Sequence, residues 1–128
     1  MVKQHRILIV DDNPSLRQEL RSLLDGYPEF EIGGEAADGL EAIDVVEKIH
    51  PDLILMDLSM PRMGGLQATR EIKKKWPETK ILVFTVYQNP EYQRAVFEAG
   101  ANGYVQKDSS RAELINSIRK TLTGNGHP

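Results

Sequence analysis

Three aspartates in this sequence follow directly after short apolar runs, and their carboxylates are of the kind that together hold a hard cation. Asp11 and Asp12 follow the run 7–10, and Asp57 follows the run 53–56. Two carboxylates about 5 Å apart repel each other by roughly 3 kcal/mol at an effective dielectric constant of 20. A fold with no use for this repulsion would be more stable without it. If both runs end at one edge of a sheet, the acids predict a site for a divalent cation.

Two further side chains with hydrogen-bonding groups stand in equivalent positions later in the chain. Thr85 follows the apolar run 81–84, and Lys107 comes shortly after the run 103–105. If all four runs are parallel strands of one sheet, three carboxylates, a hydroxyl and an ammonium gather at one edge. In open parallel sheets, ligands bind beyond the carboxyl ends of the strands. We therefore expect the functional site at that edge.

The apolar runs themselves indicate the strands of a parallel sheet. Three of the four are continuous stretches rich in Ile, Val and Leu without polar alternation, which is typical of strands buried on both faces. A further strand is expected at 30–35, where Gly33 and Gly34 make the pattern less regular.

Segments with helical periodicity lie between the runs, and residues suited to helix ends mark their limits. Asp38 is expected to cap a helix, and the basic run 73–75 is expected to be a solvent-exposed helix end. The residues predicted to begin or end helices are Asn13, Pro14, Gly26, Asp38, Pro51, Leu66, Trp76, Pro90, Gly100 and Ser110. The result is five strand–helix repeats, which predict a doubly wound α/β domain with helices on both faces.

The size and composition of the chain fit one ordinary globular domain. It has 128 residues, 40% of them hydrophobic and 27% charged, and a net charge of −3 that gives no broad attraction to nucleic acid or anionic membranes. It has no cysteine, signal peptide pattern or apolar run of membrane-spanning length. We expect a cytoplasmic domain over residues 1–122, followed by a linker stub at 123–128, with no membrane partner.

The motifs at the ends of these runs resemble those of the receiver domain of bacterial two-component response regulators, over essentially the whole chain. They are Val-Asp-Asp at 10–12, Met-Asp-Leu-Ser-Met-Pro at 56–61, Thr85, and Gly-Tyr-Val-Gln-Lys at 103–107. The resemblance implies a flavodoxin-like (βα)5 fold with a parallel five-stranded sheet of order 2-1-3-4-5. In that order the first and third strands are neighbours, so their acids converge.

The resemblance also implies a role for each acid. Asp57 would be the phosphoacceptor, taking a phosphoryl group from a sensor histidine kinase and forming an acyl phosphate. Asp12, Asp57 and the backbone carbonyl of Ser59 would bind Mg²⁺ or Mn²⁺, which keeps its waters and bridges to phosphate. Asp11 would act through a metal-bound water. The chain would catalyse its own phosphoryl transfer and slow autodephosphorylation without being a conventional enzyme.

Thr85 and Lys107 would then bind the phosphoryl oxygens. Each hydrogen bond to a charged group contributes roughly 1.5–3 kcal/mol, and two together are close to the roughly 5.5 kcal/mol that turns a 1:99 equilibrium into 99:1. In the family, the threonine moves toward the phosphate and an aromatic residue turns inward. Here that residue is Tyr104, and the surface changed would be the fourth helix, fifth strand and fifth helix.

Several positions depart from the common receiver pattern. Val86 replaces the usual small residue after the threonine, which puts access to the site in doubt. Ser59 and Tyr87 occupy the two positions that influence the lifetime of the acyl phosphate, and a bulky Tyr87 would shield it from water. Asp108 stands where proline is frequent in receivers. Together with Gly-Tyr at 103–104 and Ser-Ser at 109–110, it resembles the NarL/FixJ subfamily, whose receivers precede a LuxR-type helix-turn-helix domain. DNA would thus be bound only through an output domain absent from this chain.

Other functions fit the same layers less well. A flavodoxin needs a Ser/Thr/Gly-rich loop after the first strand, where Asp11 and Asp12 would repel the flavin phosphate. A phosphatase with a nucleophilic aspartate needs a second acid two residues later, where Ser59 follows Asp57. A stand-alone or degenerate receiver that acts as a protein-interaction module stays open, as does a phosphorylation-dependent homodimer.

Overall fold

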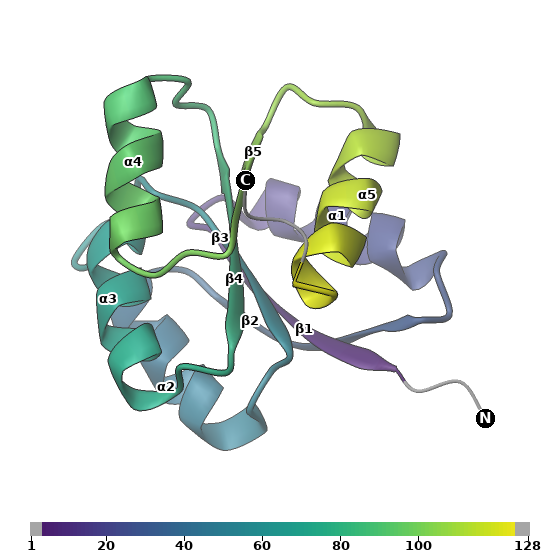
Figure 1. Cartoon of the computed structure of the whole chain (residues 1–128). Coiled ribbons are helices and arrows are strands. Elements are labelled where there is room, and N and C mark those ends of the chain that lie inside the picture. Colours follow the sequence, from purple (N-terminus) through teal and green to yellow (C-terminus); the bar gives the residue numbers. More distant parts are fainter. Residues whose placement is uncertain (1–3, 125–128) are drawn as a thin grey trace.

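A computed structural model describes residues 4–124, in which five strands alternate with five helices (Figure 1). The elements are β1 (His5–Val10), α1 (Pro14–Asp25), β2 (Phe30–Ala36), α2 (Gly39–Ile49), β3 (Leu53–Met56), α3 (Gly65–Lys75), β4 (Lys80–Thr85), α4 (Pro90–Glu98), β5 (Gly103–Gln106) and α5 (Arg111–Leu122). The strands form one parallel sheet of order β2-β1-β3-β4-β5. The predicted flavodoxin-like α/β fold is confirmed.

Helices cover both faces of the sheet, with α1 and α5 on one side and α2, α3 and α4 on the other (Figure 1). Successive residues of β1 alternate between two cores: Ile7 and Ile9 pack toward α1 and α5, while Leu8 and Val10 pack toward the other three helices. All four are at most 1% exposed. Burying each such side chain contributes roughly 1.5–3 kcal/mol. Burial on both faces explains why this strand is an uninterrupted apolar run.

The register of the central strands brings their carboxyl ends level. Val10 of β1 pairs with Met56 of β3, and Met56 pairs with Val83 of β4. The ladder continues one step further, because the Asp57 N–H donates to the carbonyl of Val10 at 3.0 Å. The residues that follow β1 and β3 therefore emerge side by side.

Polar side chains begin four of the helices. Asn13, Asp38, Asn89 and Ser110 each accept a hydrogen bond from a backbone N–H in the first helical turn. This satisfies donors that have no partner inside the helix. Helix α3 is different, because it begins at Gly65 with no side-chain cap and ends one residue before the predicted Trp76. The caps confirm Asn13, Asp38 and Ser110 as predicted helix starts.

Strand β2 is longer and less regular than predicted. It runs to Ala36, and its pairing with β1 shifts between Ile7 and Leu8, so that Gly33 is an extra residue in the ladder. At the other end of the chain, Thr123 and Gly124 donate to carbonyls of the last turn of α5. Residues 125–128 of the predicted linker lie outside the described residues, and the domain limits stay a prediction.

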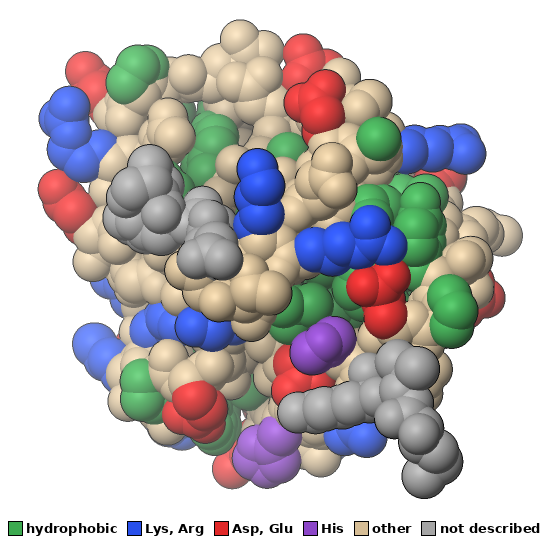
Figure 2. Space-filling model, turned by 45° about the vertical axis from the view of Figure 1, so that its right-hand side comes forward, with side chains coloured by type: hydrophobic (Ala, Val, Ile, Leu, Met, Phe, Trp, Pro, Cys, Tyr) green, Lys and Arg blue, Asp and Glu red, His purple; other side chains and the backbone are tan. Residues whose placement is uncertain are grey.

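Within residues 4–124, the helices are all too short or too polar to cross a lipid bilayer. Figure 2 shows one face of the molecule, on which basic and acidic side chains are interspersed. That face carries no broad basic patch of the kind that binds nucleic acid.

Candidate functional site

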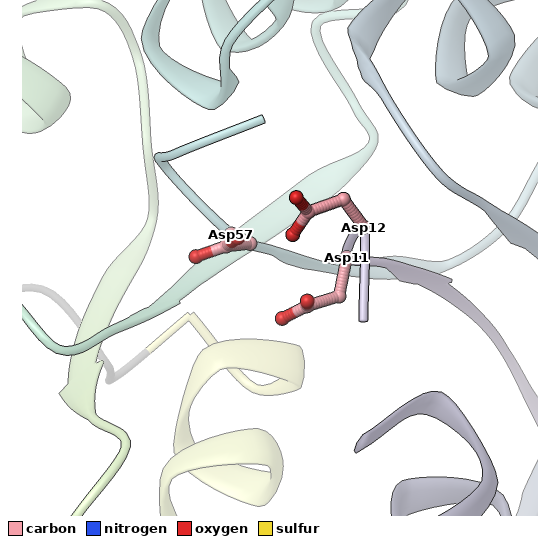
Figure 3. Close-up of side chains that lie close together, drawn as sticks. All are labelled: Asp11, Asp12 and Asp57. Atoms are coloured by element: carbon pink, nitrogen blue, oxygen red, sulfur yellow. The ribbon is translucent and has the colours of Figure 1, made fainter. Parts of the chain in front are cut away.

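The three aspartates lie together at the carboxyl ends of β1 and β3 (Figure 3). One carboxylate oxygen from each of Asp11, Asp12 and Asp57 lies within 4.8 Å of the other two. Asp11 and Asp57 are buried, whereas Asp12 is exposed. Carboxylates at this spacing, with one open to solvent, have the donor set that Mg²⁺ prefers. The predicted convergence of the acids is confirmed.

Lys107 is the cation of this cluster and is placed there by the turn after β5. Its Nζ lies 2.7 Å from Oδ2 of Asp11 and 3.2 Å from Oδ1 of Asp57. Burial alone would lower the pKa of Lys107. The hydrogen bond to Asp11 and the charges of Asp57 and Asp11 outweigh burial and raise the pKa above its usual value. Lys107 is therefore a charged ammonium at neutral pH.

One ammonium does not balance three carboxylates. Burial and the nearby charge of Asp11 raise the pKa of the Asp57 carboxyl above its usual value, although Lys107 acts in the opposite direction. The ionised form of Asp57 is thus held at a cost in free energy. A divalent cation between Asp12 and Asp57 would remove that cost, so the residues present fit such an ion.

The hydrogen bonds distinguish the two neighbouring acids. Oδ1 of Asp11 accepts from the Asn13 N–H at 2.9 Å, and Oδ2 of Asp11 accepts from Lys107. Within residues 4–124, the carboxylate of Asp12 makes no hydrogen bond or ion pair. Asp12 is therefore free to bind a cation directly, whereas both oxygens of Asp11 are already engaged.

The loop after β3 carries Ser59 and is fixed close to its own strand. The Gly65 N–H donates to the carbonyl of Leu58 at 3.0 Å, which folds the loop back on itself. A Cβ at Gly65 would clash with the carbonyl oxygen of Asp57, so the residue that begins α3 must be glycine. This packing holds the backbone around Ser59 beside the acids.

Helix α2 holds the same loop from its other side. The Gly39 N–H donates to the carbonyl of Met63 at 2.8 Å. Arg62 has a left-handed φ of 64° and pairs with Asp38. Asp38 is only 1% exposed and also caps α2 through the Glu41 N–H. Asp38 therefore does more than the helix capping predicted for it.

Thr85 ends β4 and is fully buried. Its Oγ1 accepts a hydrogen bond from the Tyr87 N–H at 3.2 Å, and its carbonyl accepts from the Lys107 N–H at 2.8 Å. The backbone of Lys107 is thereby anchored to the end of β4. Thr85 thus lies at the same sheet edge as the acids, as predicted.

Tyr104 is half-buried. It packs on the apolar side chains shared by α2, α3 and α4, and its hydroxyl donates to the carbonyl of Tyr87. The peptide backbone of Tyr87 therefore links the hydroxyls of Thr85 and Tyr104. The Tyr87 ring lies against the Tyr92 ring of α4, with 4.8 Å between the ring centroids.

The two residues predicted to affect the lifetime of the acyl phosphate border one pocket. Ser59 and Tyr87 both line a space of about 300 Å³ between the loop after β3 and helix α4. Val86 is 66% exposed, so its larger side chain is not packed into the protein beside Thr85.

Two arginines near the site have no counterpart in the sequence-based predictions. Arg17 of α1 donates to the carbonyl of Asp11, and Arg62 holds the loop after β3. Neither belongs to a motif, and each pairs with a carboxylate distant in the sequence: Arg17 with Glu35, and Arg62 with Asp38. The left-handed backbone of Arg62 is not signalled by any glycine or asparagine at that position.

The comparisons with known proteins agree with this geometry. The response regulator receiver domain family matches residues 7–119. The transcriptional regulatory protein DegU of Brevibacillus brevis is 34% identical over 122 residues, covering 95% of this chain and 52% of that protein. A protein-glutamate methylesterase/protein-glutamine glutaminase of Pyrococcus abyssi (strain GE5 / Orsay) is 42% identical over 110 residues, covering 85% of this chain and 30% of that protein.

A solved structure of a LuxR-family two-component response regulator from Aurantimonas sp. SI85-9A1 matches with a TM-score of 0.94 and 39% sequence identity. The match covers 98% of this chain and 90% of that one. The chain belongs to the response regulator receiver domain family. Its three aspartates are the acidic triad typical of the magnesium site in such domains. The chain spans about half the length of the curated relatives DegU, YhcZ and YxjL.

Proposed function

We propose that this domain is a phosphorylation-activated switch in which Asp57 accepts a phosphoryl group from a sensor histidine kinase. The observation that carries the proposal is the pairing of Lys107 with both Asp11 and Asp57 beside an unengaged Asp12. An oxygen of Asp57 forms a bond to phosphorus as the bond between phosphorus and the kinase histidine breaks. The product is an acyl phosphate on Asp57.

Asp12, Asp57 and the carbonyl of Ser59 would hold Mg²⁺ or Mn²⁺, with Asp11 acting through a water. The bound ion would neutralise charge between the carboxylate and phosphoryl oxygens, which otherwise repel each other. Lys107 would turn from the carboxylates to a phosphoryl oxygen. Its contacts to both acids support this role, because the ammonium already lies beside the atom that receives phosphate.

Thr85 and Tyr104 would relay phosphorylation to the surface of α4, β5 and α5. The Thr85 hydroxyl would donate to a phosphoryl oxygen. The hydrogen bonds that join Thr85 and Tyr104 through the backbone of Tyr87 support coupling between the two side chains. Ser59 and Tyr87 would set the lifetime of the acyl phosphate, because both border the same pocket beside the phosphoacceptor loop.

The output would belong to a longer protein in which this domain, residues 1–122, is joined through a linker to a DNA-binding domain. The similarity to DegU and to LuxR-family regulators supports this reading. The methylesterase relative supports a second candidate, in which the same kind of receiver controls a different output through protein contacts. Family membership supports a cytoplasmic location, and phosphorylation would promote a homodimer.

The proposal is tested by intact mass after incubation with Mg²⁺ and acetyl phosphate. Wild type should gain one phosphoryl group and Asp57→Asn none. Adduct in both proteins would mean that another residue is the acceptor. If wild type gains nothing, the same measurement with beryllofluoride distinguishes a site closed to acetyl phosphate from a degenerate receiver.

In the decay of the adduct, Tyr87→Ala should lose phosphate faster than wild type, and an unchanged rate would remove the shielding role of Tyr87.

A further inference from the structure

Arg17 on α1 ties the backbone of the acidic cluster to strand β2. Its Nη1 donates to the carbonyl of Asp11 at 2.6 Å, and its Nε donates to Glu35 at 2.9 Å. The side chain is only 18% exposed. Arg21, one turn further along α1, donates to the other oxygen of Glu35 and is 45% exposed. Of the two arginines on Glu35, Arg17 is the one that reaches the site.

The carbonyl held by Arg17 belongs to the peptide unit that joins Asp11 to Asp12. The preceding peptide unit is also tied to β2, because the Asp11 N–H donates to the carbonyl of Ala36 at 3.0 Å. The next peptide unit is held as well, because the Asn13 N–H donates to Oδ1 of Asp11. Both peptide planes beside Asp12 are therefore fixed by hydrogen bonds.

The side chain of Asp12 has no such support. It is exposed, and no hydrogen bond or ion pair within residues 4–124 holds its carboxylate. Its direction depends on the backbone from which it projects (Figure 3). Residues that orient the ligands of a metal ion typically change metal affinity by about 10- to 100-fold when they are replaced.

We propose that Arg17 is a positioning residue that fixes the peptide between Asp11 and Asp12 and thereby aims the Asp12 carboxylate at the divalent cation. This inference rests on the proposed function, since it requires that Asp12 binds the ion. Glu35 orients the guanidinium, because its carboxylate accepts the Nε–H while Nη1 reaches the carbonyl of Asp11.

The charge of Arg17 and its hydrogen bond to the carbonyl of Asp11 predict opposite changes in metal affinity when Arg17 is replaced. Arg17 is a cation near a cation site, so removing its charge would on electrostatic grounds strengthen metal binding. If its main role is to fix the peptide, removing it weakens metal binding instead. The sign of the change therefore separates the proposed role from a merely electrostatic one.

The test measures the affinity for Mn²⁺ alone, by water-proton relaxation and competition with Mg²⁺, in the absence of any phosphodonor. Arg17→Met should bind Mn²⁺ about tenfold more weakly than wild type. Arg21→Met is the matched control, because it also removes one positive charge and one arginine that donates to Glu35, but Arg21 does not contact the carbonyl of Asp11. Its affinity should equal or slightly exceed that of wild type. Arg17→Lys keeps the charge but not the forked geometry, and should weaken binding too.

Each outcome decides the inference. Equal or tighter Mn²⁺ binding by Arg17→Met would overturn it and leave the phosphoacceptor role of Asp57 intact. No Mn²⁺ binding by wild type would remove the proposed metal site and the inference with it. If Arg17→Met does not fold, the inference is tested instead with Arg17→Lys. Its affinity for Mn²⁺ is measured, and so is the NMR amide resonance of Asp12 in the metal-free protein. That resonance should shift in Arg17→Lys and stay in place in Arg21→Met, and an unmoved resonance would contradict the inference.

Discussion

At the amino end of the sheet, the ammonium of Lys73 donates to three neutral oxygens, whereas at the carboxyl end the ammonium of Lys107 is shared by two carboxylates. Lys73 Nζ lies 3.0 Å from the carbonyl of Pro77, 2.8 Å from that of Thr79 and 2.9 Å from Oδ1 of Asn102. Asn102 in turn accepts from the Ile81 N–H at the start of β4. The three oxygens that accept from Lys73 are all uncharged.

The two ends thus use a lysine for different purposes. Around Lys73, one cation donates to two backbone carbonyls and one amide oxygen, none of which carries a charge. Around Lys107, one cation faces three carboxylates and leaves an excess of negative charge. Sites kept ready for a ligand are commonly less stable than the scaffold could make them. The amino end therefore serves the fold, and the carboxyl end serves the site.

The largest effect is expected at the amino end. Lys73→Met should lower the free energy of unfolding by about 2–3 kcal/mol, because it leaves two carbonyls and an amide oxygen without their charged donor. Urea denaturation measures the loss, and affinity for Mn²⁺ should not change. Lys74→Met is the control, since the Lys74 side chain is 75% exposed and should cost almost nothing. A loss of metal affinity in Lys73→Met would show that the two ends are not independent.

A smaller effect of opposite sign is expected at the carboxyl end. Asp57→Asn should raise the free energy of unfolding by about 1 kcal/mol without metal, because it removes a buried charge that Asp11 repels. Saturating Mg²⁺ should shrink this advantage, because the ion stabilises only the protein that binds it well. Thermal unfolding of both proteins with and without Mg²⁺ gives the comparison. A destabilised Asp57→Asn would mean that the ion pair with Lys107 outweighs the repulsion.

The smallest effect concerns Glu35, an acid near the site whose charge is balanced by two arginines, Arg17 and Arg21. Burial raises the pKa of Glu35, but the hydrogen bonds from Arg21 and Arg17 outweigh it and lower the pKa below its ordinary 4.5. A carboxyl with a lowered pKa in the folded state stabilises the protein above its ordinary pKa and loses that effect as the pH falls. Glu35→Gln should therefore cost about 0.5–1 kcal/mol at pH 7 and progressively less below about pH 4.5. A cost that does not change with pH would contradict this account.

The sequence predicted the elements and the acids well because their signals are local. Each strand buried on both faces is an apolar run, and the residue after each run marks the edge of the sheet. Asn13, Asp38 and Ser110 act on the next few residues, so their capping roles are visible without the fold. The position of the site can also be predicted from the sequence, because the strand order brings together the ends of β1 and β3.

The contacts missed by the sequence join residues of different elements. Arg17 and Glu35 are 18 residues apart, and Lys73 and Asn102 are 29 apart. The run at 73–75 was predicted to be solvent-exposed, which holds for Lys74 and Lys75 but not for Lys73, whose ammonium is tied to three oxygens. No periodicity in a single chain shows which member of a basic run turns toward the protein.

The extra residue in β2 affects how copies of this domain behave in concentrated solution. β2 lies at one edge of the sheet, and an exposed edge offers its free backbone groups to a strand of another chain. The bulge at Gly33 interrupts that edge, and the aliphatic part of the Arg6 side chain stands against the glycine. The opposite edge, β5, is only four residues long. Neither edge is a long, flat template for strand addition, so the fold resists the pairing that leads to β-aggregates.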